Sequence, residues 1–311
     1  MTPTHPHPSV APCVCVIPLP SSEGSSPMIR FTDHNTGMEV QPLRNGSYAS
    51  HDGVEKTGSA CFNDDSTSIP LRVFFCVQSR QGFHMTYSVI ARCPDTGMFG
   101  IAIATRPIAI GAKCPFLKPG VGALVVQANG DPRFGPLGLD LLSMGYGAEK
   151  VLQELSDNDP HREWRQVAVV DQEGRTAAWT GQDSEDWKGH VAKQDFVSLG
   201  NRLTGEETVN AMAEIWDSTG GEDLGDRLMK CLEAGRDAGG QVGGEFSSAL
   251  KVVNRRNYAW IDLRADLHDE PVGELRRLYK HYKPLIPYYD TRPGNPDMPR
   301  DDVWRQTSQS G

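Results

Sequence analysis

The sequence predicts an α+β domain in which layers of helix cover packed antiparallel sheets. Two observations lead to this fold class. Apolar runs of strand length are joined in pairs by short turns, and two helical segments twice separate one group of strands from the next. A sheet must bury a face against another layer, so this order of elements favours helices on either side of stacked sheets.

The first half of the domain starts with a hairpin. Residues 86–92 and 98–106 flank Pro94-Asp95-Thr96-Gly97, whose residue types suit a tight turn. Residues 120–128, GVGALVVQA, form a continuous apolar run that predicts a buried strand. Two helices are then expected, over residues 134–145 and 148–156.

The second half repeats the order of strands, two helices and strands. The predicted strands span 165–171, 175–180, 196–199, 247–254 and 258–265, and the predicted helices span 206–216, 224–238 and 271–282. Pro271 opens the last helix, where its missing N–H costs nothing. The domain therefore spans 85–283, and residues 284–311 form a tail that we expect to be too rich in Pro to be helical.

Residues 1–84 differ in composition from the domain. They are crowded with Pro, Ser, Thr, Gly and His, and no apolar run is longer than Ile69–Val77. Such a segment buries too little apolar surface to offset the entropy lost on ordering. No basic region precedes the short apolar stretch Val14–Leu19, so it does not read as a secretory signal. We expect a disordered extension or a gene-model artefact, and favour the artefact.

Charge and cysteine content narrow the choice of partners. The net charge is −9 and no basic stripe is present, which argues against nucleic acid. No apolar run approaches the roughly 18 residues of a membrane-spanning helix. Four of the seven cysteines lie in residues 1–84, and the other three lack disulfide spacing, which fits a reducing, cytoplasmic compartment. We expect a small-molecule substrate, no cofactor and no metal, and the sequence leaves a homo-oligomer open.

The most informative stretch is MTYSVIAR, residues 85–92, because it reads like a protein start. A Met followed by a small hydroxyl residue is what aminopeptidases trim. If Thr86 becomes the first residue, its free α-amine, with an unperturbed pKa of about 7.7–8.0, is a built-in base for its own hydroxyl. Taken alone, these eight residues favour an ordinary strand in which Thr86 has no such role.

Five stretches of the domain resemble a mostly prokaryotic family known as domain of unknown function 1028. They are MTYSVIARCPDTGMFGIAIATRPIAIGA, GVGALVVQANGDPRFGPLGLDLLSMGYGAEKVL, RQVAVVDQEGRTAAWTG, LGNRLTGEETVNAMAE and WIDLRADLHDEPVGELRRLY. That family is similar in turn to the N-terminal-nucleophile (Ntn) hydrolases. The resemblance implies a four-layer αββα sandwich of Ntn-hydrolase type, with the nucleophile on the first strand of a hairpin.

Members of the family typically begin at the residues that match Met85-Thr86, which makes Thr86 the candidate nucleophile. In proteasome-type relatives a propeptide is cut off before the Thr, usually after a Gly. Here Phe83-His84-Met85 precede Thr86. Initiation at Met85 is therefore the simpler route to a free Thr86.

Two further residues of the first hairpin are candidates for substrate binding. Ser88 lies two residues after Thr86 and hence on the same face of the strand. Arg106 ends the second strand, near the start of the first, where it could hold a substrate carboxylate by two parallel hydrogen bonds. A surface arginine at a strand end is an equally good account of Arg106.

Other strand ends supply polar side chains. Gln127, Asn129 and Asp131 lie where a buried strand meets a turn. We assign Asn129 as an oxyanion donor, Asp131 as an orienting carboxylate and Gln127 to substrate binding, although Asn-Gly-Asp-Pro is also ordinary turn sequence. Asn201 follows Gly200 at another strand end and is a further candidate for substrate binding.

The densest polar cluster is DLRADLHD, residues 262–269. With the two-residue period of a strand, Asp262, Arg264, Asp266 and His268 share one face. We assign Asp262, Arg264 and His268 to substrate binding, and a structural ladder of ion pairs is about as good an account. Members of the family usually carry an acid at the position of Leu267, which argues against a metal site here.

Two functions remain open from the sequence. The first is a hydrolase of amide-type bonds in a small molecule, with Thr86 as nucleophile and its own amine as base. The second is a non-catalytic domain that binds a small ligand on the same fold. The sequence names no substrate.

Overall fold

The computed structural model describes residues 31–32, 39–42, 48–49, 55–56 and 85–308. The chain divides into two compact units, Met1–Gly82 and Phe83–Gly311. In the first unit four short antiparallel strands pair in chain order: β1 (Phe31–Thr32), β2 (Glu39–Pro42), β3 (Tyr48–Ala49) and β4 (Glu55–Lys56). The other residues of 1–84, for which we expect disorder or a gene-model artefact, lie outside the described residues.

The second unit contains two antiparallel sheets. The larger sheet has six strands in the order β11-β12-β5-β6-β13-β14. Its strands are β5 (Thr86–Arg92), β6 (Phe99–Thr105), β11 (Gly189–Lys193), β12 (Phe196–Asn201), β13 (Ser247–Val253) and β14 (Ala259–Ala265). The hairpin expected at the start of the domain is thus at the centre of this sheet.

The smaller sheet has four strands in the order β10-β9-β8-β7. They are β7 (Pro115–Lys118), β8 (Gly122–Ala128), β9 (Arg165–Asp171) and β10 (Thr176–Thr180). The apolar run predicted as a buried strand is β8, whose residues from Gly122 to Gln127 are all buried.

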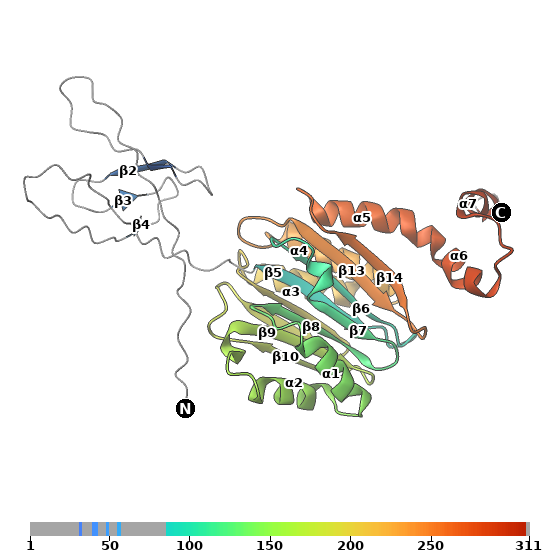
Figure 1. Ribbon diagram of the computed structural model, residues 1–311, viewed down its shortest axis with the longest axis horizontal. Coiled ribbons are helices and arrows are strands. Elements are labelled where there is room, and N and C mark those ends of the chain that lie inside the picture. The colour runs from blue at the N-terminus through green and yellow to red at the C-terminus, as the bar shows by residue number, and fades with distance from the viewer. Residues whose placement is uncertain (1–30, 33–38, 43–47, 50–54, 57–84, 309–311) are drawn as a thin grey trace, which may run out of the picture. The chain divides into compact units, whose positions relative to one another are not determined.

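Helices lie on the outer face of each sheet (Figure 1). The smaller sheet carries α1 (Phe134–Ser143) and α2 (Ala148–Asp157), and the larger sheet carries α3 (Glu207–Ser218), α4 (Leu224–Asp237) and α5 (Pro271–Tyr282). Short 3₁₀ helices occur at η1 (Ile110–Ala112) and η2 (Arg162–Trp164).

Three hydrophobic cores separate these four layers. One lies between α3–α5 and the larger sheet, one lies between the two sheets, and the third lies between the smaller sheet and α1–α2. Stacked layers of this kind are the stable way for a sheet to bury both faces. The αββα sandwich that the sequence predicts is therefore confirmed.

Strand β5 shows how the sequence produces this stacking. Tyr87, Val89 and Ala91 belong to the core beneath the helices, whereas Ile90 belongs to the core between the sheets. Because side chains alternate along a strand, Thr86 and Ser88 share the face of Ile90. Both hydroxyl residues therefore point into the space between the two sheets.

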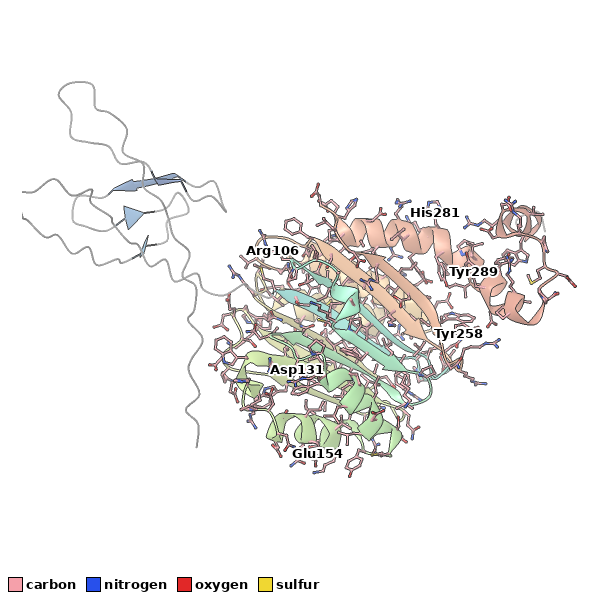
Figure 2. All side chains as sticks on the ribbon, in the orientation of Figure 1. Arg106, Asp131, Glu154, Tyr258, His281 and Tyr289 are labelled. Atoms are coloured by element: carbon pink, nitrogen blue, oxygen red, sulfur yellow. The ribbon has the colours of Figure 1, made fainter. Side chains whose placement is uncertain are left out.

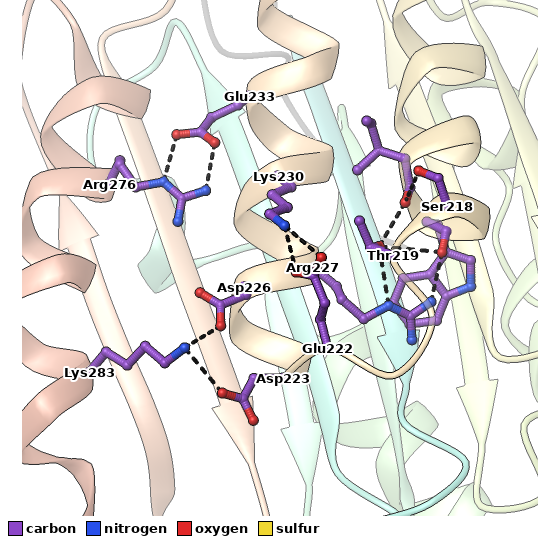
Figure 3. A network of polar contacts seen from close by, with 12 residues as sticks. Ser218, Thr219, Glu222, Asp223, Asp226, Arg227, Lys230, Glu233, Arg276 and Lys283 are labelled. Atoms are coloured by element: carbon purple, nitrogen blue, oxygen red, sulfur yellow. Dashed lines mark hydrogen bonds and ion pairs between the residues drawn. The ribbon is translucent and has the colours of Figure 1, made fainter.

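Charged side chains fasten the outer helices to one another (Figure 3). Arg276 of α5 makes two hydrogen bonds with the carboxylate of Glu233 in α4, at 2.7 and 2.5 Å. Lys283, just after α5, contacts the carboxylates of Asp223 and Asp226 at the start of α4. Such pairs fix the packing of α5 against α4, while the apolar core beneath supplies most of the stabilisation.

The sequence did not reveal two strands, β7 and β11. Both are edge strands, and β7 begins with Pro115, a residue that edge strands tolerate. Their half-exposed side chains give them no continuous apolar pattern.

The expectation of a non-helical tail after residue 283 is wrong. The segment forms η3 (Lys283–Leu285), α6 (Ile286–Thr291), η4 (Arg292–Gly294) and α7 (Asp301–Ser308). Each of the first three carries a Pro in its opening turn, namely Pro284, Pro287 and Pro293. A Pro in the first turn removes an N–H that has no helical partner, so proline divides this segment into short helices without preventing them.

Removing residues 1–84 should leave the domain intact, because all three described cores consist of residues from 87 onward. We expect the melting temperature of residues 85–311 to lie within a few degrees of that of the full chain. Differential scanning calorimetry measures this, and a fall of about 5 °C or more would show that the first unit contributes to the core.

Candidate active site

A layer of polar side chains closes one end of the otherwise apolar space between the sheets. The larger sheet presents a row across four neighbouring strands, in which the paired residues are Asn201, Thr86, Thr105 and Ser247. Ser88 lies one step deeper on β5, and Gln127 and Gln166 face it from the smaller sheet. All seven residues are buried. These seven residues are called the polar layer below.

Thr86 is the first residue of β5 and is only 2% exposed. Its Oγ1 lies 3.0 Å from Oγ1 of Thr105, its partner across the β5–β6 hairpin. The Thr105 hydroxyl also donates to the carbonyl oxygen of Met85. Met85, the residue just before Thr86, therefore accepts the hydrogen bond of the same Thr105 hydroxyl that contacts Thr86.

A chain of side-chain amides runs from β5 across to the smaller sheet. The Ser88 hydroxyl donates to Oε1 of Gln127 at 2.7 Å, and Nε2 of Gln127 donates to Oε1 of Gln166 at 2.7 Å. Nδ2 of Asn201 donates to the same Gln166 oxygen at 3.0 Å. Three of the predicted residues, Ser88, Gln127 and Asn201, are thus brought together through Gln166.

Gln166 continues the chain toward the edge of the sandwich. Its Nε2 lies 3.0 Å from the Thr180 hydroxyl and 3.1 and 2.8 Å from the carbonyl oxygens of Gly189 and Gly200. The Thr180 hydroxyl lies 2.9 Å from Nδ1 of His190 at the surface. Gln166 therefore binds side chains or carbonyls from both sheets.

Backbone strain accompanies the polar layer. Ala128 and Arg202, which directly follow Gln127 and Asn201, have φ angles of 61° and 51°. Residues with a Cβ avoid this left-handed region, and holding one there costs about 1–3 kcal/mol. The surrounding structure thus forces the chain to turn sharply just beyond two members of the layer.

Arg106 and Asp131 follow strands of different sheets, β6 and β8 (Figure 2). Arg106 comes directly after Thr105 and is exposed; its guanidinium donates to the Gly243 carbonyl and lies 5.0 Å from the centre of the Phe246 ring. A cation over a ring face is held weakly, by about 0.5–1 kcal/mol at exposed sites. These contacts do not test whether Arg106 binds a substrate carboxylate, so that role stays a prediction.

Asn129 and Asp131 make no hydrogen bond to Thr86 among the described residues. The Asp131 carboxylate receives three side-chain hydrogen bonds and a backbone hydrogen bond from Arg133, and these side-chain bonds above all lower its pKa to about 2. The backbone N–H of Phe134 donates to the Asp131 carbonyl at the start of α1. Asp131 is thus engaged in a turn, while Asn129 is exposed just beyond β8.

The structure does not bring Asp262, Arg264 and His268 to Thr86. Asp262 and Arg264 lie on β14, which is at the sheet edge and is separated from β5 by β13 and β6. The strand ends at Ala265, so the expected strand face does not extend to Asp266 and His268. Asp262 is 44% exposed and lies 3.4 Å from Nζ of Lys251; Arg264 pairs with Asp266 at 2.9 Å. Nδ1 of His268 accepts from the Glu270 backbone N–H. The two ion pairs agree with the alternative that the cluster is structural. A two-residue alternation looks the same on an exposed edge strand as in a site, so the sequence could not decide between the two.

The described residues offer no metal site, and an open hollow among them lies away from the polar layer. No group of three or more His, Cys, Asp or Glu side chains there is arranged to hold a metal ion. An open hollow of about 370 Å³ is lined by Tyr289, Arg292, Pro293 and Pro296, in the C-terminal segment rather than at the polar layer. None of the described helices is both long and apolar enough to cross a membrane.

Sequence reasoning missed Thr105 and Gln166, which hold the polar layer together. Thr105 ends an apolar strand, and Gln166 is the second residue of a strand whose next five residues are buried. A polar residue inside an apolar strand is the signal that could have identified Gln166, since a buried amide needs partners.

Three comparisons place the chain among known proteins. A family model described as "Family of unknown function (DUF1028)" matches residues 86–275. The crystal structure of protein SPO2555 from Silicibacter pomeroyi, assigned to the same family, is similar with a TM-score of 0.59 and 29% identity, over 64% of this chain and 89% of that chain. Anbu (ancestral beta-subunit) from Yersinia bercovieri matches with a TM-score of 0.33 and 14% identity, over 69% of this chain and 98% of that chain. No match was found among curated proteins.

Replacing Gln166 with Leu should destabilise the domain by about 3 kcal/mol or more. The change removes the partner of Gln127 and Asn201 and leaves several buried polar groups unsatisfied, each at a cost of about 1–3 kcal/mol. Urea unfolding measures the difference. The matched control is Gln172→Leu in the exposed turn between β9 and β10, which should change stability by less than about 0.5 kcal/mol. Equal stability of the two variants would contradict a stabilising role for the layer.

Proposed function

The chain belongs to the DUF1028 family, and we propose that it is a hydrolase of amide-type bonds in small molecules, with Thr86 as an N-terminal nucleophile. One observation carries the proposal. Thr86 begins the central strand β5 at the polar end of the space between the sheets, and its hydroxyl is held there by Thr105. A terminal residue in this position would have its nucleophile fixed by the fold and its base on the same residue.

The proposed chemistry proceeds in two steps. The Thr86 amine takes the hydroxyl proton as Oγ1 attacks the substrate carbonyl carbon, and the leaving amine departs with that proton. The product of this step is an ester between the acyl group and Thr86. Water, activated by the same amine, then cleaves the ester and releases the carboxylic acid, which restores the free hydroxyl.

The negative charge that develops on the carbonyl oxygen needs donors. The Thr105 hydroxyl already donates to a carbonyl oxygen, that of Met85, and lies 3.0 Å from Oγ1 of Thr86. When Met85 is removed, this hydroxyl loses its acceptor and becomes a candidate donor to the substrate. Asn129, exposed after β8, is the candidate carried by the sequence.

One observation favours the alternative, a domain that binds a small ligand without catalysis. With Met85 attached, the nitrogen of Thr86 is part of a peptide bond and cannot accept a proton. Thr86 is then buried and the Thr105 hydroxyl is occupied. In that state only the binding function is open to the polar layer.

The nucleophile is tested in a protein that begins at Thr86, against a panel of amides, ureides and acylated amino acids. Thr86→Ala should abolish turnover with the fold intact, because the loss of one hydroxyl in a strand is modest in cost. Thr86→Ser should keep part of the activity, since it retains both hydroxyl and amine. Ser88→Ala, which changes the neighbouring hydroxyl on the same face, is the matched control and should have the milder effect. If the Thr86→Ala protein turns over substrate at the parent's rate, the proposal is wrong.

The rate should rise with pH through the pKa of the Thr86 amine and then level off. The amine works only when unprotonated, and burial disfavours its charged form, so we expect this pKa below the unperturbed value of about 7.7–8.0. A profile of kcat/KM against pH measures it. A rate that is flat between about pH 5 and 9 would contradict the amine as base.

A further inference from the structure

One buried acceptor in the polar layer has no donor among the described residues. Oδ1 of Asn201 makes no hydrogen bond to any of them, although Asn201 is fully buried. Buried polar side-chain atoms nearly always have partners, so an exception calls for an explanation in terms of strain, function or a group that arrives later.

The orientation of the Asn201 amide follows from its neighbours. The carbonyl oxygens of Gly189 and Gly200 can only accept, so Gln166 must turn its Nε2 toward them. Oε1 of Gln166 then faces Asn201, which must answer with Nδ2. A flipped Asn201 would set two oxygens against each other. The oxygen without a donor is therefore Oδ1.

The hydroxyls of the row cannot satisfy this oxygen. The single proton of Thr105 goes to the Met85 carbonyl, so in the contact between the two threonines Thr86 is the donor. With Met85 in place, Thr105 thus donates to Met85 and Thr86 donates to Thr105, while the Ser247 hydroxyl donates to the Pro107 carbonyl. A donor for Asn201 has to come from another group.

We propose that this donor is the α-amine of Thr86 once Met85 is removed, and that Asn201 is the residue that positions the base. Asn201 and Thr86 are paired across β12 and β5. Directly opposed Cβ atoms lie about 4.5–5.5 Å apart, within reach of an Asn side chain. The peptide nitrogen of Thr86 carries one proton, whereas an amine carries two or three. The inference rests on the proposed function, because the amine exists only in a chain that starts at Thr86.

The hydrogen bond to Asn201 would orient the amine as well as hold it. One N–H directed at Oδ1 leaves the lone pair of the neutral amine free for the proton of the Thr86 hydroxyl. The polar layer is built from β5, β6, β8, β9, β12 and β13, and all its side chains are uncharged hydroxyls or amides. Three described charged groups beyond them are engaged elsewhere: Arg106 with the Gly243 carbonyl, Asp131 with Arg133, and Arg165 with Asp159. Glu245, whose pKa burial raises, interacts with Tyr87, the residue after Thr86, and is common to the parent and to an Asn201 variant. Asn201 is then the influence on the amine that a change at this residue removes.

The test is the pKa of the Thr86 amine in a protein of residues 85–311 from which Met85 has been removed. The described cores lie within this part of the chain, and a crystallised relative consists largely of the same domain. Acetic anhydride reacts only with the neutral amine, so the pH dependence of acetylation, followed by the mass of the N-terminal peptide, gives the pKa without turnover. Asn201→Ala should lower it by about one pH unit, because the acceptor that stabilises the ammonium form is lost.

The matched control is Ser198→Ala. Ser198 is buried in the same strand, but its hydroxyl donates to the Val209 carbonyl on the helix side, so the amine should titrate as in the parent. A second measurement needs no variant: the side-chain amide resonances of Asn201 in the parent should move with the titration of the amine. The inference is overturned if Asn201→Ala leaves the amine pKa unchanged, or if the Asn201 resonances stay fixed through it.

The outcomes separate this inference from the proposed function. A lowered amine pKa in Asn201→Ala, in a parent that hydrolyses nothing on the panel, supports the hydrogen bond and counts against the hydrolase. An active parent whose amine pKa is indifferent to Asn201 supports the hydrolase and removes Asn201 as its positioning residue.

Discussion

The hydrogen bonds of the buried Gln166 side-chain amide determine how the polar layer around Thr86 is arranged. Its Nε2 is fixed by carbonyl oxygens that can only accept, and this orientation passes through Gln127 to Ser88 on one side and to Asn201 on the other. Each amide in the chain then has one allowed direction. A polar network adds rigidity when all its members are satisfied and is costly when one is not, which makes the Asn201 oxygen the weak point of this one.

Much of the fold could be predicted because its signals are local. The turn at Pro94–Gly97, the apolar run of β8 and the helix that starts at Pro271 each lie within a few neighbouring residues. The same holds for Ser88, Gln127 and Asn201, which interrupt or end apolar strands. Their types and positions are visible in the sequence, although the contacts among them are not.

The remaining features depend on which strands pair, and a sequence pattern does not contain that information. Thr105 matters because the hairpin register sets it opposite Thr86, and Gln166 because its sheet packs against β5. Asp262 illustrates the converse. Its alternating pattern would look the same facing a site or facing solvent, and the order of the strands places it at the edge.

The state of the Met85–Thr86 bond decides between the two functions. With the bond intact, Met85 occupies the Thr105 hydroxyl, Thr86 has no amine, and the Asn201 oxygen has no donor. With the bond cut, the base appears and the hydroxyl is released in one step. The proposed chemistry thus depends less on further catalytic side chains than on where the mature chain begins.

Mass spectrometry of the N-terminal peptide, taken from the protein isolated from its natural source, tests this central claim most directly. The account predicts a peptide that begins at Thr86 with an unmodified amine. A mature protein that retains Met85, or any residue before it, would contradict the nucleophile and leave a ligand-binding domain in its place.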